Sequence, residues 1–365
     1  MRDMVRGRME PADLDYVVLG GTEDDLRRNV PGLIRVGRDI PVFLKGATQY
    51  TFSTFTSIED DLASRDLTIN ALAQDKSGVV IAHPLALADL RDKILRPVSA
   101  DNFLADPLRV IRAARFAAVL SDFSVHAELL AAMRSVSAQG LGSVAAERVG
   151  QESLKACEGH KPGNFLRILH AGDALDPWLA EFAAADAIPA GPSSHHDTSV
   201  LEHTAQVMDG CAGQPMAVWM ALCHDLGKTV TPVTALPRHI GHEKEGEPLA
   251  ANLAFRLRLP KRHLVAGRLA VRWHMAGGLY ANLRPSTKVR LLLALDRAGV
   301  VDQFFQMVAA DQGGNHTAAA RKDLLLIKSV RLPDKHRGLG PRSAEILLQL
   351  RCEALADLSG QDLVR

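Results

Sequence analysis

Near residue 98 the pattern of this sequence changes from strand-forming to helix-forming. Beyond this point strand signals nearly vanish, and apolar residues recur with the 3.6-residue period of an α-helix. Before it, 14–19, 34–44 and 79–85 are rich in strand-favouring residues, and apolar spacing predicts a helix over 61–73. The chain is therefore expected to be α+β, with a small mixed sheet followed by a helical body. Helices are predicted over 107–120, 125–136, 144–157, 163–172, 201–211, 216–226, 246–257, 261–275, 286–296 and 341–356.

The length of the chain predicts more than one folding unit. A chain of 365 residues exceeds what one hydrophobic core usually organises, which suggests about two or three units. The stretch 187–198, rich in proline, glycine and serine, is the best internal boundary. We predict a head over 1–97, a helical neck and body over 98–190, a further all-helical domain over 191–320 and a helical tail over 321–365.

Composition places the chain among globular proteins. Hydrophobic residues make up 47% and charged residues 23%, and no run approaches the roughly 20 apolar residues that a bilayer span needs. The N-terminus has no apolar signal segment, and the four cysteines form no C-x-x-C pair. We therefore expect a cytoplasmic protein with no membrane partner, no disulfides and no thiolate zinc site. The net charge of +1 indicates no partner, so nucleic acid would have to bind a local basic surface.

Two acids stand at the start of the first predicted strand. Asp13 and Asp15 are separated by one residue, so the alternation of side chains along a strand places both carboxylates on one face. Such a pair can hold divalent ions that activate an attacking hydroxyl and neutralise a leaving pyrophosphate. Taken alone, the pattern is more often a solvated strand end.

A charged stripe follows the helix predicted over 107–120. Asp106, Arg109, Arg112 and Arg115 recur every third residue and extend over about 13–14 Å, a length that matches a nucleoside triphosphate. Arginine can make bidentate contacts to phosphate or to the acceptor edge of a base. On spacing alone, a solvated helix face is the alternative.

A histidine–aspartate pair follows an apolar helical segment in the second half of the chain. Imidazole nitrogens and carboxylate oxygens suit manganese, iron, cobalt, nickel or zinc, and adjacent His and Asp can share metals. Water at such a site becomes more acidic and can attack a phosphate ester. His239 competes with His242 as a ligand, and His203 could instead be a capping or core histidine. The ligand candidates are His203, His224, Asp225, His242, His274 and Asp311.

Several blocks of the first half resemble, in order, those of the class II tRNA nucleotidyltransferases, the CCA-adding enzymes. The blocks are RDxxRG, DLDYVVLG, VGRDIPVF, EDDLASRDLTINALAQD, HPLALADLRDKILRPVS and DPLRVIRAARFAA. The resemblance implies a nucleotidyltransferase head in which Asp13 and Asp15 hold catalytic Mg²⁺. It also implies that Asp106 and Arg109 read the Watson–Crick edge of CTP or ATP. The other implied nucleotide contacts are Arg2, Arg65, Arg112 and Arg115.

The head departs from the family pattern in two places and is expected to be truncated. In the family, a Gly-Gly or Gly-Ser turn that cradles the triphosphate precedes the block at Met1, whereas Gly20 and Gly21 lie beyond the carboxylates. The family also has a further strand and basic loop where Lys45–Ser57 is short and contains no acid. Either the start is assigned too late beside an internal deletion, or the head has decayed. We expect a head that binds nucleotides but transfers them weakly.

The second half resembles the HD domain appended to some bacterial CCA-adding enzymes. The resemblance implies metal-dependent 2′,3′-cyclic phosphodiesterase, 2′-nucleotidase and phosphatase activity, with Ni²⁺, Mn²⁺ or another transition metal. Lys228 and Arg238 are candidates for holding the substrate phosphate, with ordinary surface roles as the alternative. Basic residues of the helical body are expected to contact the acceptor stem of tRNA. They are Arg134, Arg148, Lys155, Lys161 and Arg167.

The expected protein is a bifunctional tRNA-maturation enzyme, monomeric or homodimeric. Its head would add C, C and A to the tRNA 3′ end, and its HD domain would trim phosphates from damaged ends. The main alternative is an HD phosphohydrolase whose head only binds nucleotide or RNA. A poly(A) polymerase of the same superfamily and a non-enzymatic tRNA scaffold are weaker alternatives.

Overall fold

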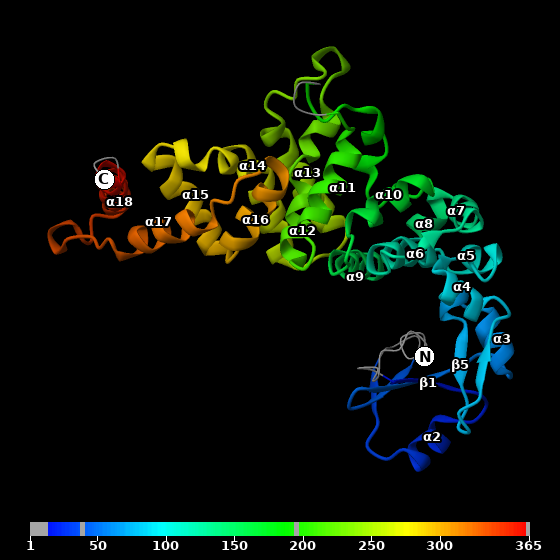
Figure 1. The fold of residues 1–365 in the computed structure, drawn as a ribbon. Coiled ribbons are helices and arrows are strands. Elements are labelled where there is room, and N and C mark those ends of the chain that lie inside the picture. The colour runs from blue at the N-terminus through cyan, green and yellow to red at the C-terminus, as the bar shows by residue number, and fades with distance from the viewer. Residues whose placement is uncertain (1–13, 37–40, 193–196, 363–365) are drawn as a thin grey trace. The chain divides into compact units, whose positions relative to one another are not determined.

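Residues 14–36, 41–192 and 197–362 are described by the structure, a computed structural model. The chain divides into two units, Met1–Ala113 with Asp122–Gly140, and Ala114–Ser121 with Leu141–Arg365. Helix α6 (Leu108–Val119) carries the chain from the first unit into the second (Figure 1). The four-part division drawn from the sequence stays a prediction.

A four-stranded mixed sheet forms in the first unit, as the sequence predicts. Its strands are β1 (Leu14–Val18), β2 (Ile34–Val36), β3 (Val42–Lys45) and β4 (Thr48–Phe52), in the order β1-β4-β3-β2. β1 runs parallel to β4, and the other pairs are antiparallel. The interpretation that the extra strand is missing is wrong in part. β4 occupies that segment and pairs with β1, although it carries no acid.

Short elements make up the rest of the first unit. Leu26, from the first helix after β1, packs with Leu33 and Phe43 in a small core. β7 forms a two-residue parallel pair with β8, and β8 lies beyond residue 98, where strand signals fade. The elements are α2 (Glu23–Asn29), α3 (Ile58–Ala63), η1 (Thr68–Asn70), β5 (Leu72–Gln74), β6 (Val80–Ala82), α4 (Ala86–Asp92), β7 (Ile94–Leu95), α5 (Ala100–Ala105), β8 (Ser124–Val125) and α7 (Ala127–Arg134).

The single helix predicted over 61–73 is wrong. α3 ends at Ala63, and the chain continues through the turn η1 into β5. Leu62, Ile69 and Leu72 are all buried. Their spacing therefore reflects burial in the core and does not show that they lie on one continuous helix. The backbone leaves the helix because the Thr68 N–H donates to the Arg96 carbonyl, a bond that an uninterrupted helix would not allow.

Helices make up most of the second unit in the part that the structure describes, and α8 crosses the boundary between the two units. Short 3₁₀ turns connect several of its helices. The helices are α8 (Ala138–Gly142), α9 (Ala146–Cys157), α10 (Gly163–Ala171), α11 (Val200–Gly210), α12 (Pro215–Cys223), α13 (His242–Arg256), α14 (Lys261–Gly278), α15 (Pro285–Ala298), α16 (Val301–Gln312), α17 (Thr317–Ser329) and α18 (Pro341–Asp362). The turns are η2 (Ala180–Phe182), η3 (Ala185–Ala187), η4 (Leu226–Val230), η5 (Val233–Ala235), η6 (Tyr280–Asn282) and η7 (Asp334–His336).

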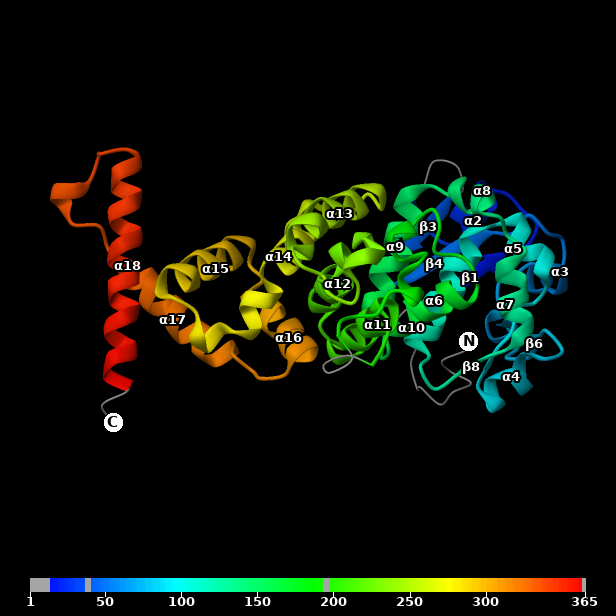
Figure 2. The same cartoon turned by 90° about the horizontal axis from the view of Figure 1, so that it is seen from above.

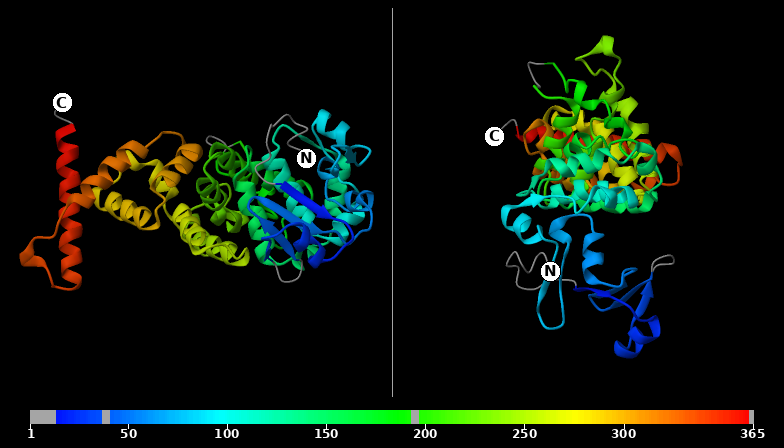
Figure 3. Two further views of the ribbon diagram at one scale, coloured as in Figure 1. Left: turned by 90° about the horizontal axis from the view of Figure 1, so that it is seen from below. Right: turned by 90° about the vertical axis from the view of Figure 1, so that its right-hand side faces the viewer.

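Helix α12 is the centre of this second core. Its residues from Ala217 to Cys223 are all buried, because α9, α11, α14 and α16 pack around it (Figures 1 and 2). A helix that is apolar on every side is stable only when it is enclosed in this way. Further along the chain, α15, α17 and α18 contact one another (Figures 2 and 3). No helix within the described ranges is long and apolar enough to cross a membrane.

Candidate functional site

The six ligand candidates of the second half meet at the end of α12. His224 follows the last residue of that helix, and Asp225 is the N-cap residue of the turn η4. Neighbouring helices bring the other four. His203 comes from α11, His242 is the first residue of α13, His274 lies in α14 and Asp311 lies in α16. Three of these helices pack directly on α12, so the apolar core fixes the positions of the polar ligands.

One group of ligand atoms gathers on the α11 side. His203 Nε2 lies 3.4 Å from His224 Nε2 and 3.4 Å from Asp225 Oδ2. Asp311 Oδ1 lies 3.1 Å from the same nitrogen of His203. His203, His224 and Asp225 are buried and have the spacing of a group that can hold one ion.

A second group lies on the α13 and α14 side. His242 Nε2 is 3.1 Å from His274 Nε2, and these nitrogens lie 3.5 and 3.4 Å from Asp225 Oδ1. Asp225 thus presents Oδ2 to the first group and Oδ1 to the second. Within the described residues these are the two groups with metal-ligand spacing, and they share one carboxylate.

Backbone carbonyls fix which nitrogen faces the centre in three of the four histidines. Nδ1 of His224 donates to the Ala221 carbonyl, and Nδ1 of His242 donates to the His239 carbonyl, each at 2.7 Å. Nδ1 of His274 donates to the Val271 carbonyl at 2.9 Å. Each ring therefore turns an Nε2 lone pair toward the centre, as metal-ligating histidines do.

These residues fit divalent ions by their chemistry and spacing. Both oxygens of Asp225 are buried without a hydrogen-bond partner, although Lys228 Nζ forms an ion pair with Oδ2 at 2.8 Å. Two nitrogens that bind one tetrahedral ion at about 2.0–2.1 Å are about 3.3 Å apart. The Nε2 pairs of His203 with His224 and of His242 with His274 lie at 3.4 and 3.1 Å. Divalent cations would satisfy these acceptors.

The electrostatics of the centre match this interpretation. Burial lowers the pKa of His224, but the carboxylates of Asp225 and Asp311 outweigh it and raise that pKa to about 10. Burial raises the pKa of Asp225, and His224 and Lys228 more than offset this, so the carboxyl stays ionised well below its usual range. A metal ion would take the place of the bound protons, so binding releases protons.

Two neighbouring residues are engaged elsewhere. His239 bonds through Nε2 to the Pro189 carbonyl and through Nδ1 to the Thr231 hydroxyl, both at 2.8 Å, which removes it as a competitor of His242. Lys228 is buried, and its Nζ donates to the Ala190 carbonyl as well as pairing with Asp225. Lys228 therefore supports Asp225, and its contact with a substrate phosphate stays a prediction.

In the first unit, only one of the two predicted metal-binding carboxylates, Asp15, lies within the described residues. Asp13 and Arg2 lie outside the described residues. Asp15 is exposed on β1, opposite Gln49 of β4. The described part of this unit contains no group of acids with metal-ligand spacing.

The arginine stripe on α6 is half-buried and held by other protein groups. Arg112 donates to Asp66 Oδ2 through Nε and Nη2 at 2.8 and 2.7 Å. Arg115 pairs with Glu152 of α9 at 2.5 Å, and Arg109 donates to the Asn102 carbonyl at 3.0 Å. The alternative of a solvated helix face is therefore wrong.

The remaining two residues of that predicted nucleotide set are also held locally. Asp106 accepts from the Leu108 N–H at the start of α6. Arg65 pairs with Asp61 at 3.0 Å and donates to the Asn70 carbonyl.

Sequence reasoning missed the acids that orient these arginines. Asp66 and Glu152 are both buried, and Asp66 also accepts from the Leu67 N–H and the Asn70 amide. A detectable signal existed for Glu152, because it stands on the face of α9 shared by Val149 and Ala156. A charged residue on an apolar face indicates a buried partner.

Comparisons with known proteins place the chain in a family. No family model matches it. It is 37% identical over 341 residues to the Multifunctional CCA protein of Pseudomonas aeruginosa, covering 86% of this chain and 82% of that protein. It is 32% identical over 403 positions to the Multifunctional CCA protein of Alcanivorax borkumensis, covering 100% of this chain and 97% of that protein. The chain belongs to the multifunctional CCA protein family.

Solved structures of CCA-adding enzymes share the fold of this family member. The enzyme of Bacillus stearothermophilus in complex with CTP has a TM-score of 0.64 at 22% identity, covering 96% of this chain and 85% of that chain. The Thermotoga maritima enzyme complexed with tRNA has a TM-score of 0.60 at 19% identity, covering 98% and 89%. The predicted α+β class and the predicted enzyme class, nucleotidyltransferase of the CCA-adding type, are confirmed at the level of the family.

The basic residues predicted to meet tRNA differ in their surroundings. Arg134, Arg148, Lys155 and Lys161 are exposed. Arg167 is half-buried and pairs with Glu202 at 2.8 Å and Asp209 at 2.7 Å, which raises its pKa. Arg167 therefore joins α10 to α11. Contact of the four exposed residues with the acceptor stem stays a prediction.

Close backbone contact at Gly227 sets the position of His242. A β-carbon at Gly227 would lie 1.9 Å from the His242 carbonyl oxygen and 2.8 Å from the Gly246 nitrogen. Gly227→Ala is expected to destabilise the second unit by about 1–3 kcal/mol or more and to weaken metal binding. Calorimetry and metal titration measure both effects.

Gly142→Ala is the matched control for this change. Its β-carbon would lie 3.6 Å from Pro177, an ordinary contact, so little change is expected. Equal stability and equal metal affinity in the two variants would contradict the role given to Gly227.

Proposed function

We propose that this member of the family is a CCA tRNA nucleotidyltransferase whose second unit is a two-metal phosphohydrolase. The observation that supports the phosphohydrolase activity is that the two oxygens of Asp225 face two separate histidine pairs. The proposed hydrolytic activities are 2′,3′-cyclic phosphodiesterase, 2′-nucleotidase and phosphatase. Ni²⁺ or Mn²⁺ suits the nitrogen-rich ligand set. The setting is cytoplasmic, and the partners are tRNA, CTP and ATP.

In the second unit, the protein's own side chains would bind the metal ions, and its backbone carbonyls orient the histidine rings. Divalent ions supply two things in such a site, a more acidic water and neutralisation of phosphate charge. His203, His224 and Asp311 would hold one ion, and His242 and His274 would hold the other. Asp225 would contribute to both positions, and His224 and Lys228 keep its carboxylate ionised. The carbonyls behind the rings hold the histidines in the tautomer that ligates.

In the first unit the proposed roles follow the family resemblance. Asp13 and Asp15 would hold Mg²⁺, and Asp106 with Arg109 would read the incoming base. The Bacillus stearothermophilus enzyme binds CTP, and the Thermotoga maritima enzyme binds tRNA. Asp66 and Glu152 would keep Arg112 and Arg115 extended toward the nucleotide.

A second candidate is a phosphohydrolase whose head binds nucleotide or RNA without efficient transfer. Two observations favour it. β4 carries no acid. The 403-position alignment with the Alcanivorax borkumensis protein exceeds the 365 residues of this chain, so that relative has internal segments that this chain lacks.

One paired assay tests the proposal. Wild type, Asp13→Ala/Asp15→Ala and His224→Ala/Asp225→Ala are each tested for CTP and ATP addition to a trimmed tRNA and for cyclic-phosphate hydrolysis with Ni²⁺ or Mn²⁺. We expect separable losses, each variant losing one activity. A wild type that hydrolyses but adds nothing would establish the second candidate, and loss of both activities in either variant would refute two independent sites.

A further inference from the structure

Gln312, the last residue of α16, follows the candidate metal ligand Asp311. Its amide nitrogen Nε2 donates to Asp311 Oδ2 at 2.9 Å and to the His274 backbone carbonyl at 3.2 Å. A side-chain amide carries two N–H hydrogens, so these two bonds use both of them. His274 belongs to one group of ligands and Asp311 lies in the other. Gln312 therefore links the two groups from outside the six ligands.

The two oxygens of Asp311 have different partners. Oδ1 lies 3.1 Å from His203 Nε2 and 3.6 Å from His224 Nε2. Oδ2 accepts the hydrogen bond from Gln312. A carboxylate can bind a cation through one oxygen or through both, and a hydrogen bond to one oxygen leaves the other to face the ion. Gln312 therefore determines which oxygen of Asp311 faces the histidines.

Gly278, at the end of α14, leaves room for this amide. A β-carbon at Gly278 would lie 1.7 Å from Gln312 Oε1 and 2.6 Å from its Cδ. One residue earlier, a β-carbon at Gly277 would lie 2.7 Å from Val308 Cγ2 of α16, so the two helices are in close contact here. The side chain of Gln312 therefore fits against α14 because residue 278 has no side chain.

The hydrogen bonds of Gln312 differ from those of a solvated helix residue. Side chains on a helix surface bond mostly to water, to the backbone or to a neighbour on the same helix. Gln349 of α18 is exposed and bonds to Glu353, four positions away. Gln312 is exposed as well, but its amide joins a ligand carboxylate to a carbonyl 38 positions away. This difference favours a specific role for Gln312 at the metal centre.

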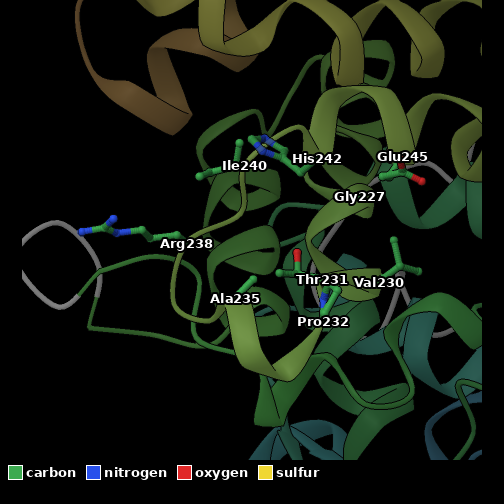
Figure 4. Close-up of a pocket in the computed structure, with 9 residues that line it drawn as sticks. All are labelled: Gly227, Val230, Thr231, Pro232, Ala235, Arg238, Ile240, His242 and Glu245. Carbon is green, nitrogen blue, oxygen red and sulfur yellow. The ribbon is translucent and has the colours of Figure 1, made fainter.

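A pocket that His242 helps to line is built from another part of the chain. It has a volume of about 310 Å³. The residues that line it, drawn in Figure 4, all lie between Gly227 and Glu245. A change at Gln312 leaves these walls in place, so its effect can be measured on the metal ligands alone.

We propose that Gln312 is a positioning residue of the metal centre, which directs Asp311 Oδ1 toward an ion held by His203 and His224. The inference rests on the proposed two-metal function and adds a residue outside its ligand set. The hydrogen bond holds the carboxylate in its ligating orientation before an ion binds, so that binding need not order it. Loss of such an outer-shell partner typically costs about 10–100-fold in metal affinity.

Two variants remove this hydrogen bond in different ways. Gln312→Ala deletes the amide, and Gly278→Ala displaces it, although alanine itself favours a helix. In Mn²⁺ titration of the metal-free full-length protein, each should weaken the binding of one ion about tenfold and leave the other unchanged. In Gln312→Ala/Gly278→Ala the loss should equal that of Gln312→Ala, because no amide remains to be displaced.

Thermal unfolding separates positioning from a purely structural role. Without metal, Gln312→Ala should have the Tm of the wild type, and the rise in Tm on adding Mn²⁺ should be smaller. Gln349→Ala is the matched control, since it removes an exposed glutamine bond on α18. It should behave as wild type in both measurements.

Three results would overturn the inference. They are wild-type Mn²⁺ affinity in Gln312→Ala, additive losses in the double variant, and a lower Tm of metal-free Gln312→Ala with an unchanged rise on adding Mn²⁺. A wild type that binds no Mn²⁺ would refute the proposed metal centre, and the inference would fall with it.

Discussion

Asp225→Asn is expected to abolish phosphoester hydrolysis and to release both metal ions, because Asp225 is the one carboxylate that both histidine groups share. The loss should exceed the roughly 10–100-fold that removal of an outer-shell partner costs. Metal content after dialysis and kcat/KM on a cyclic phosphodiester measure the two effects. CTP addition by the first unit should be unchanged.

His242→Ala is the informative comparison for that variant. It removes a ligand from one group and leaves His203, His224 and Asp225 together. We expect it to retain one ion and to lose most activity, whereas Asp225→Asn retains none. If Asp225→Asn kept two ions, the shared carboxylate would not hold the centre together.

Asp66→Asn is expected to destabilise the first unit by about 3 kcal/mol, the lower end of the range for breaking a buried ion pair. Asp66 is 5% exposed and receives two hydrogen bonds from Arg112. Urea unfolding monitored by circular dichroism measures the loss. CTP addition should fall as well, since Arg112 loses the group that orients it.

The pH dependence of this pair has a definite sign. Burial raises the pKa of Asp66, but the charge of Arg112 and hydrogen bonds from Asn70 and Leu67 outweigh it and hold the pKa below its usual value. An acid whose pKa is lower in the folded state stabilises the fold above its unfolded pKa of about 3.9. That stability is lost as pH falls toward the folded pKa. The difference between wild type and Asp66→Asn should therefore shrink below about pH 5.

Asp92→Asn is the control for the buried pair. Asp92 pairs with Arg91 on the surface, where water screens the interaction, so no measurable change is expected. A similar loss of stability in both variants, or a difference between wild type and Asp66→Asn that stays constant to pH 3, would contradict the role of Asp66.

The sequence predicted the helices of the second unit well because their signal is local. The predicted segments 107–120 and 163–172 correspond to α6 and α10 within a residue or two. The same reasoning failed over 61–73, where buried residues at helical spacing belong to three short elements. The predicted start of α13, residue 246, is also too late. The first turn of that helix, His242 to Glu245, is polar and shows no apolar periodicity.

For the metal centre, residue types and their order were enough to name six candidate ligands, but not to arrange them. His203 and Asp311 are 108 positions apart and lie within 3.1 Å only because α11 and α16 pack on each other. Packing also decided that Lys228 supports Asp225 and that both nitrogens of His239 are engaged.

The change near residue 98 from a mixed α+β pattern to a mainly helical one was determined by the sequence alone, because periodicity depends on neighbours along the chain. Only the tertiary structure decided which acids pair with the α6 arginines and which carboxylate the two histidine pairs share. A buried charge finds its partner through space, and the partner of Arg112 lies 46 positions away. Such pairings follow from which faces the helices bury against one another.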